Sequence, residues 1–260
     1  MKGTMTLLDS FLLGALEGFT EFLPISSTGH LILLSEVLGI PSTEFVKSFM
    51  IAVQLGAIAA VVILYFKKFL DIEVIKRLIV GFIPTGIIGF TLYQLIKDYL
   101  LGNSLIVVWA LFLGGIALIA FELLHKESEE EPEEIRTLPY RTVALVGLFQ
   151  SVAMIPGVSR SAATIVGGLL LGMRRTTIVE FSFLLAVPTM VAATGYDILK
   201  SFDTFPTDGF GLLAVGFVTS LVVALLSMKL LISFVKKHTF IPFGIYRIVL
   251  AVLFFLFVLA

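Results

Sequence analysis

The amino-acid sequence predicts an all-α integral membrane protein with six transmembrane helices and two re-entrant helical hairpins, arranged as an inverted-topology repeat. Three observations predict it: the overall composition, six long apolar stretches, and two regions where polar residues interrupt short apolar segments. The 260 residues are 58% hydrophobic and 14% charged, with a mean hydropathy of +1.07. Because soluble domains carry roughly 25% charged residues, this composition indicates a polytopic membrane protein. The net charge of -1 argues against a nucleic-acid partner.

Six apolar stretches approach the roughly 20 residues that a helix needs to cross a bilayer. They cover residues 45–66, 75–96, 99–124, 179–199, 209–233 and 239–260. Charged residues or turn sequences such as "GIPST" bound each stretch. Pro84 and Pro188 fall inside two of them, where neighbouring helices can satisfy the carbonyls that a proline frees. We therefore expect six transmembrane helices.

Two further regions, 6–37 and 140–173, hold apolar segments that are too short to cross. Polar residues separate "LLDSFLLGAL" from "HLILL" in the first region, and "PGVSRS" separates "VALVGLF" from "AATIVGGLLLG" in the second. Apolar segments of about 10–14 residues are typical of re-entrant structure. Non-helical backbone at membrane depth is tolerated only against protein or a water-filled cavity. Each hairpin tip is therefore expected to line a cavity.

The two hairpins resemble each other, which indicates an internal repeat. "LPISSTGHLIL" and "IPGVSRSAATI" both run from a proline through hydroxyl residues into an apolar helix, and each hairpin precedes a span that opens with Glu-Phe. Three spans follow each hairpin, so the second hairpin enters from the opposite side, as in inverted repeats. We assign one membrane domain over 1–260, with a first repeat at 1–124, an acidic cytoplasmic loop at 125–139 and a second repeat at 140–260.

Basic residues predict the orientation, because cytoplasmic loops are enriched in lysine and arginine. One set of loops holds Lys67, Lys68, Lys76, Arg77, Lys126, Arg136, Arg141, Arg174, Arg175, Lys236 and Lys237; the other set holds Lys2, Lys47, Lys97 and Lys200. We therefore place both termini outside a cell membrane and the second hairpin on the cytoplasmic side. The acidic run "ESEEEPEE" (127–134) is interpreted as a solvated cytoplasmic loop.

Glu17 and Glu21 are the first candidate functional residues. They are four positions apart, so a helix presents both carboxylates on one face. Ionisable groups at membrane depth are costly, and both glutamates directly precede the first hairpin tip. Carboxylate oxygens suit hard divalent cations such as Mg²⁺ or Ca²⁺. A pair of solvated acids at a helix end is the alternative.

The hairpin tip "PISSTGH" adds Ser26, Ser27, Thr28 and His30. One of the three hydroxyls is expected to cap the following helix. A histidine beside serines can serve as a general base for a hydroxyl nucleophile or act as a nucleophile itself. Beside two acids in an apolar chain, this group favours catalysis.

The second hairpin tip, "PGVSRSAAT", supplies Ser159, Arg160, Ser161 and Thr164 at the start of a short helix. Backbone N–H groups at a helix N-terminus, hydroxyls and a fork-shaped guanidinium together form a phosphate site. An arginine that reaches the membrane surface is the alternative. Gln54 is interpreted either as an interhelical hydrogen-bond partner or as a group facing the cavity. The predicted phosphate contacts are Ser26, Thr28, Gln54, Ser159, Arg160, Ser161 and Thr164.

Four segments carry a resemblance to the undecaprenyl-diphosphate phosphatase family, the bacitracin-resistance type of membrane phosphatase. They are "EGFTEFLPISSTGHLIL" (17–33), "IAVQLGAIAAVV" (51–62), "PGVSRSAATI" (156–165) and "EFSFLLAVP" (180–188). The resemblance implies removal of the terminal phosphate from a polyprenyl diphosphate, dependence on a divalent cation, and a site that opens to the outer face. It also implies catalytic roles for Glu17, Glu21, Ser27, His30 and Arg160.

The expected mechanism has Glu17 and Glu21 holding the cation against the diphosphate and Arg160 neutralising the transferred phosphoryl group. The nucleophile stays open between Ser27, His30 and a water molecule, with His30 as the base if Ser27 or water attacks. The expected partners are the lipid substrate and the bilayer, and a homodimer is kept open. A transporter or flippase for an anionic lipid or a phosphate-bearing solute is the alternative function, because broken helices in inverted repeats are typical of transporters.

Overall fold

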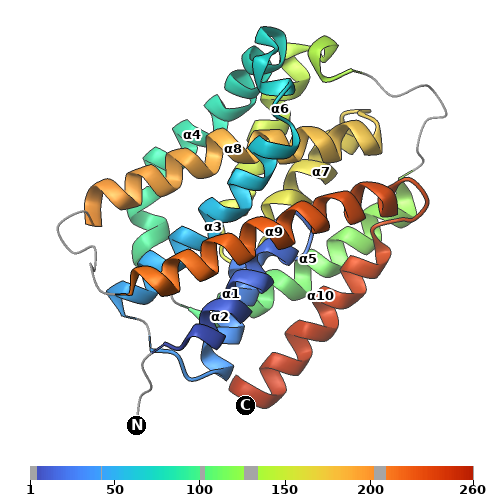
Figure 1. Ribbon diagram of the computed structural model, residues 1–260. Coiled ribbons are helices and arrows are strands. Elements are labelled where there is room, and N and C mark those ends of the chain that lie inside the picture. Colours follow the sequence, from blue (N-terminus) through green and yellow to red (C-terminus); the bar gives the residue numbers. More distant parts are fainter. Residues whose placement is uncertain (1–4, 42, 100–102, 126–133, 202–208, 260) are drawn as a thin grey trace.

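The structure is a computed structural model that describes residues 5–41, 43–99, 103–125, 134–201 and 209–259. These residues form ten α-helices. The helices are α1 (Leu7–Thr20), α2 (Ser27–Val37), α3 (Glu44–Leu64), α4 (Ile72–Tyr99), α5 (Ser104–Leu124), α6 (Tyr140–Gln150), α7 (Arg160–Leu170), α8 (Arg175–Ser201), α9 (Phe210–Val235) and α10 (Ile241–Phe254) (Figure 1). Short 3₁₀ segments at Lys68–Leu70, Ile135–Thr137 and Ser151–Met154 and a π-helical end at Phe255–Leu259 complete it. Most of the predicted acidic loop, residues 126–133, lies outside the described residues.

Within the described ranges, five helices are long and apolar enough to cross a membrane: α3, α4, α5, α8 and α9. The sixth predicted stretch, 239–260, forms a shorter apolar helix over Ile241–Phe257. Large apolar side chains cover the outside of the bundle, including Phe90 at 79% exposure and Leu124 at 85%. Extended apolar surfaces of this kind mark contact with a membrane or a partner. The chain is therefore a helical multi-pass membrane protein, and the sixth crossing stays a prediction.

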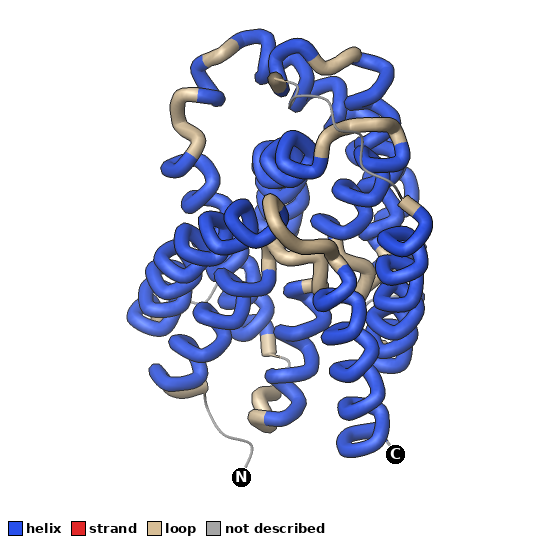
Figure 2. Tube along the Cα trace, turned by 90° about the vertical axis from the view of Figure 1, so that its right-hand side faces the viewer, coloured by secondary structure: helices blue, strands red, loops and turns tan. Residues whose placement is uncertain are grey.

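Two pairs of short helices occupy the regions where hairpins are predicted. Helices α1 and α2 flank a loop at residues 21–26, and α6 and α7 flank a second break at 151–159. Figure 2 shows loop segments in the middle of the molecule, enclosed by helices. Phe22 at the first tip and Ser159 at the second are almost fully buried. Each pair therefore brings irregular backbone into the interior.

Helix packing repeats between the two halves of the chain. Helix α1 packs against α9, and its counterpart α6 packs against α4; α3 packs against α9, and α8 against α4. The pairs α3–α8 and α5–α10 each join equivalent helices of the two halves. Exchanging helices α1–α5 with α6–α10 therefore leaves these contacts unchanged.

Glycines allow the closest crossings. A Cβ atom added to Gly14 of α1 would lie 2.5 Å from the carbonyl oxygen of Gly216 on α9, and one on Gly18 would come closer still to that of Ser220. On the equivalent pair α6–α4, a Cβ on Gly147 would overlap the carbonyl oxygen of Gly81. Small residues let helix backbones approach in membrane proteins. These contacts fix α1 and α6, and so hold both loops in place.

Candidate functional site

The two loops meet in the centre of the molecule, and hydroxyls from the second loop bind backbone carbonyls of the first. Ser161 Oγ donates to the Phe22 carbonyl at 2.8 Å, and Ser159 Oγ lies 3.4 Å from that of Leu23. Carbonyls at a helix end lack intrahelical partners and need other donors when buried. Ser159 also caps α7 by accepting from the Ala162 N–H at 3.1 Å. The contacts join the two halves of the chain at this site.

Glu21 connects the loops through its two carboxylate oxygens. Ser27 Oγ donates a short hydrogen bond to Oε2, and Arg160 Nη2 lies 3.1 Å from Oε1. The side chains of Glu21 and Arg160 are 6% and 12% exposed. A buried pair like this is stabilised by charge and hydrogen bonding together. Three predicted site residues therefore form one continuous chain of contacts.

Arg160 is the first residue of α7 and reaches across the second loop to the first. Its Nη1 donates to the Ser182 carbonyl of α8 at 2.9 Å, and its guanidinium lies 5.9 Å from the centre of the Phe22 ring. Its Nε–H is buried and has no hydrogen-bond partner in the part of the chain that the structure describes. An arginine at the start of a helix, with an N–H to spare, is suited to bind an anion.

Glu17 lies one helical turn before Glu21 and is fully buried. Both of its carboxylate oxygens lack hydrogen-bond partners among the described residues. Buried polar groups are normally satisfied, so these two oxygens are available to a partner such as the neighbouring Glu21 carboxyl or a bound cation. The described residues contain no cluster of three or more His, Cys, Asp or Glu side chains that could hold a metal on their own. These groups fit a cation that also takes oxygens from a bound phosphate, as Mg²⁺ usually does.

Ser26 stands in a backbone conformation that side chains rarely adopt, with φ 71° and ψ 91°. Its hydroxyl lies 3.4 Å from the Gly29 N–H and caps α2, as expected for one hydroxyl of the tip. Non-glycine residues with positive φ cost free energy and concentrate at functional sites. The turn directs Ser27 towards Glu21.

His30 contacts other groups than Ser27. Its Nδ1 is 2.7 Å from the Ser26 carbonyl, and its Nε2 is 2.8 Å from the Tyr246 hydroxyl of α10. Because a carbonyl only accepts, Nδ1 carries a proton, and in the neutral tautomer Nε2 then accepts from the Tyr246 hydroxyl. The rings of His30 and Tyr246 stack 5.5 Å apart. The sequence places His30 beside the Ser27 hydroxyl, whereas in the structure His30 contacts Ser26 and Tyr246 and the Ser27 hydroxyl contacts Glu21.

The remaining predicted phosphate contacts lie apart from this chain of contacts. Thr28 is exposed on α2, and Thr164 donates within α7 to the Arg160 carbonyl at 2.8 Å. Gln54 is partly buried on α3 and makes no hydrogen bond to the site groups within the described ranges. The hydroxyls of Ser159 and Ser161 bind carbonyls of the first loop instead. Only Arg160 of the second tip lies against the carboxylates.

Arg247 of α10 is a site-supporting residue whose role the sequence leaves undecided. Its guanidinium is 1% exposed and donates to four backbone carbonyls, those of Pro24 (3.3 Å), Gly157 (3.2 Å), Ala110 (3.0 Å) and Leu111 (3.3 Å). Pro24 belongs to the first loop and Gly157 to the second. Arg247 therefore holds both loops against α5. The only signal in the sequence is a lone charge within an apolar stretch.

The fold and the site together define a polytopic helical membrane protein with a buried polar site made by two interrupted helix pairs. The chain belongs to the BacA family: the family model described as bacitracin resistance protein BacA matches residues 10–253. A relative from Sulfurihydrogenibium, named undecaprenyl-diphosphatase, is 55% identical over 97% of this chain and 99% of its own. Relatives with the same name from Persephonella marina and Aquifex aeolicus are 54% and 52% identical, covering 98% and 97% of this chain and all of their own. The family resemblance noted in the sequence is confirmed.

Proposed function

We propose that this chain is a membrane phosphatase that hydrolyses undecaprenyl diphosphate to the monophosphate and inorganic phosphate, and so recycles the lipid carrier for envelope glycan synthesis. The relatives' shared name supports the reaction, since the identity extends over nearly the full length of both chains. The observation that carries the proposal is the contact chain Ser27–Glu21–Arg160. It joins a hydroxyl, a carboxylate that can accept the hydroxyl proton, and a guanidinium that can bind phosphate.

Ser27 is the nucleophile in this proposal. Its Oγ bonds to the terminal phosphorus, its proton passes to Glu21, and the bond from that phosphorus to the bridging oxygen breaks. The bridging oxygen stays with the lipid, which leaves as the monophosphate. Water then hydrolyses the phosphoserine, releases inorganic phosphate and restores the Ser27 hydroxyl. Both nitrogens of His30 are engaged elsewhere, which favours an orienting role for His30 through Ser26 and Tyr246.

Arg160 changes partners during the reaction. Without substrate it pairs with Glu21 and leaves Nε open. A diphosphate offers the guanidinium two oxygens in the planar geometry that it prefers. As Arg160 turns to the phosphate, it releases Glu21 Oε1, while Oε2 keeps its contact with the Ser27 hydroxyl and can accept its proton. Phosphoryl transfer depends mainly on such positioning and charge stabilisation.

A divalent cation, Mg²⁺ or Ca²⁺, completes the proposal. Glu17 would hold it with its two open oxygens, and Glu21 would share it once Arg160 turns away. When bound, the cation would neutralise charge on the diphosphate. Excess EDTA should abolish turnover, added Mg²⁺ should restore it, and Glu17→Gln should raise the Mg²⁺ concentration needed for half-maximal rate. Full activity in excess EDTA would remove the cation from the proposal.

The membrane arrangement is part of the proposal. The repeated packing of α1–α5 and α6–α10 supports an inverted repeat, with both short pairs as re-entrant hairpins and α10 as the sixth span. Described basic residues gather at the end where α3 and α9 finish and α4, α6 and α8 begin. Helix α1 begins and α10 ends at the opposite end (Figure 1). By the positive-inside rule, the proposal has both termini outside, and the family resemblance implies a site that opens to the outer face.

Phosphate release from undecaprenyl diphosphate by the purified protein in detergent tests the function directly. Transport has no meaning without a sealed membrane, so release there supports a phosphatase. Binding of the lipid without phosphate release would favour the transporter alternative. The relatives' names do not favour that alternative. A homodimer stays a prediction, to be tested by the mass of the detergent-solubilised protein after subtraction of detergent.

A further inference from the structure

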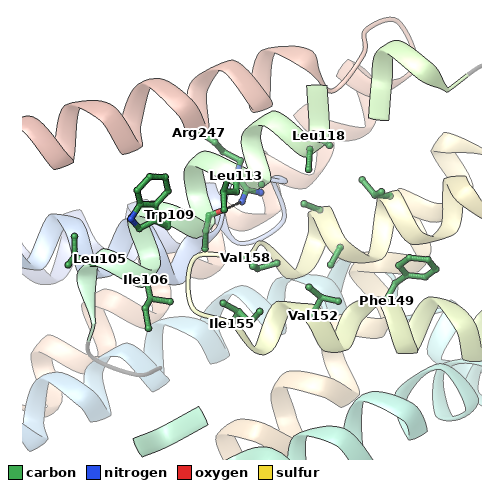
Figure 3. A pocket seen from close by; sticks show the side chains of 16 residues that line it. Leu105, Ile106, Trp109, Leu113, Leu118, Phe149, Val152, Ile155, Val158 and Arg247 are labelled. Atoms are coloured by element: carbon green, nitrogen blue, oxygen red, sulfur yellow. Dashed lines mark hydrogen bonds between the residues drawn. The ribbon is translucent and has the colours of Figure 1, made fainter. Parts of the chain in front are cut away.

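A cavity of about 770 Å³ separates α5 from the second helix pair. Figure 3 shows it bordered by α5 on one side and by residues of α6, the 151–158 segment and α7 on the other. Its volume lies within the range of small-molecule sites. A second cavity, between α5 and the last helix, is much smaller at about 180 Å³.

The lining of the larger cavity is apolar. Among the described residues that line it, Arg247 carries the only charge, and that charge is already bound to backbone carbonyls. Small side chains cover the facing walls, with Ala110, Gly114 and Ala117 on α5 and Ala162 and Ala163 on α7. Small residues at such spacing usually let two membrane helices pack closely. Here the helices stand apart, and the small side chains leave space between them.

The cavity is a groove that opens sideways on the bundle. Trp109 and Leu113 on its rim are each 57% exposed, and Val152 opposite them is 51% exposed. From Leu105 to Leu118 it follows α5 over fourteen residues, and the thirteen steps between them span about 20 Å at 1.5 Å per residue. The hydrocarbon core of a bilayer is about 30 Å thick. A flexible chain from the bilayer could therefore lie along the groove.

The groove borders the second loop, which contributes Ile155 and Val158 to its lining. Helix α7 begins with Arg160, and its next turns supply Ala162, Ala163 and Val166 to the groove wall. At the inner wall, Arg247 donates to the Gly157 carbonyl at 3.2 Å and to the Pro24 carbonyl at 3.3 Å. A lipid whose phosphate reaches Arg160 would meet the groove within about one helical turn, 5.4 Å.

We propose that this groove binds the head-proximal isoprene units of the polyprenyl chain. The proposal rests on the proposed function, which supplies a substrate with a long apolar chain and a diphosphate at one end. Alanine and glycine on the facing walls leave space that the regular methyl branches of an isoprenoid chain can fill. The groove would thus select the substrate by its chain, while Arg160 and the carboxylates bind its head.

Filling the groove tests this with a matched pair of variants. Val166→Trp places an indole in the groove, and Val222→Trp makes the same change on the exposed surface of α9, where Val222 is 49% exposed. In mixed micelles, Val166→Trp should raise KM for undecaprenyl diphosphate at least tenfold with kcat little changed, and Val222→Trp should change neither. Equal KM values for the two variants, or a loss confined to kcat in Val166→Trp, would overturn the proposal.

A binding measurement on the unmodified groove guards against a misfolded variant. A farnesyl diphosphate analogue with a diazirine on its terminal isoprene unit is bound to Ser27→Ala protein, irradiated and mapped by mass spectrometry. Labelling should concentrate on α5 between residues 105 and 118 and on α7, and unlabelled undecaprenyl diphosphate should suppress it. Labelling spread over the outer surface would mean that the groove holds bulk lipid.

The two proposals fail in different ways. If the chain is no phosphatase, wild type releases no phosphate, yet competed labelling of α5 and α7 would still establish the groove as a polyprenyl site. If only the groove is wrong, wild type and Val166→Trp both hydrolyse the substrate with the same KM.

Discussion

The Ser27 hydroxyl donates to a single carboxylate oxygen of Glu21, and Glu21's other oxygen faces Arg160. Each member of this chain depends on the next for its charge or orientation. Removing one therefore disturbs the reaction without opening a cavity in the apolar core. Functional loss with an intact fold is the expected result of conservative changes here.

Ser27→Ala should lower kcat by about a thousandfold or more, because it removes the attacking oxygen and leaves only binding and charge stabilisation. Phosphate release measures the loss, and the thermal midpoint should stay within a few degrees of wild type. Ser233→Ala, an exposed serine on α9, is the matched control and should leave both unchanged. Turnover near wild type in Ser27→Ala would assign the attack to another group.

Arg160→Lys keeps the positive charge but removes the planar fork that grips two phosphate oxygens. We expect kcat/KM to fall at least tenfold, equivalent to about 1.4 kcal/mol of transition-state stabilisation. Arg160→Ala should be worse. An arginine that served only to reach the membrane surface would tolerate lysine, so unchanged kinetics would take the second loop out of the site.

At this scale the sequence predicts which polar residues lie at the two loops better than it predicts how they pair. Glu17, Glu21, His30 and Arg160 stand out because charged or titratable groups are rare in an apolar chain. The partner of His30 is Tyr246, 216 positions away, and no local spacing predicts that contact. The sequence predicts that the hydroxyls of Ser159 and Ser161 bind phosphate, whereas in the structure they contact carbonyls of the first loop. Those carbonyls are remote in sequence, so no local spacing predicts these contacts.

Helix α10 supports both loops through one buried side chain. The Arg247 guanidinium satisfies carbonyls from the first loop, the second loop and α5. Because one guanidinium donates to four carbonyl oxygens, these hydrogen bonds depend on the shape of the Arg247 side chain as well as on its charge. The consequence is that α10, though it carries none of the predicted catalytic residues, sets the relative position of the two loops.

Arg247→Lys should therefore lower both stability and turnover. An ammonium group has three N–H donors on one nitrogen and cannot span these acceptors, and each buried group left unsatisfied costs about 1–3 kcal/mol. We expect a lower thermal midpoint and a fall in kcat larger than any change in KM. Arg141→Lys, at an exposed position on α6, is the control. A midpoint and kcat that match this control would show that Arg247 does not hold the loops.

Gly147→Ala tests the crossing of α6 and α4. The added Cβ would overlap the Gly81 carbonyl oxygen, so the helices must separate. Overpacking of this kind costs about 1–3 kcal/mol, which a lower thermal midpoint should report. Gly211→Ala on α9 meets nothing within 4 Å and serves as the control. Equal midpoints for the two variants would contradict the close crossing.

The helices themselves follow largely from the sequence. Apolar stretches of sufficient length predict α3, α4, α5, α8 and α9, and the Pro- and Gly-containing interruptions predict two pairs of short helices. The last helix is shorter than its apolar stretch suggests, since α10 starts at Ile241 and passes into π-helix after Phe254. Composition measures apolarity, and it does not report where the backbone hydrogen-bonding pattern changes.

Among the described residues, helices α1–α5 and α6–α10 pack with matching contacts, and each set contributes one loop to the central site. An inverted repeat requires the two halves to have opposite orientations in the membrane. Because the chain has no cysteine, single introduced cysteines can report this orientation without background.

Lys237→Cys, after α9, should react only with a reagent applied from the cytoplasmic side, and Phe210→Cys, at the start of α9, only from outside. Both native side chains are exposed, so access should not limit labelling. Labelling of intact cells and of inverted vesicles with a membrane-impermeant maleimide distinguishes the sides. The reverse pattern would turn the site towards the cytoplasm.

The central claim is that the two loops act as one catalytic unit, and a double-mutant cycle tests it most directly. Phosphate release from undecaprenyl diphosphate is measured for wild type, Glu21→Asp, Arg160→Lys and the double variant. Residues in contact couple by about 0.5–3 kcal/mol, whereas independent sites add within about 0.5 kcal/mol. We predict that the loss of kcat/KM in the double variant differs clearly from the product of the two single losses. Losses that multiply would contradict a shared site.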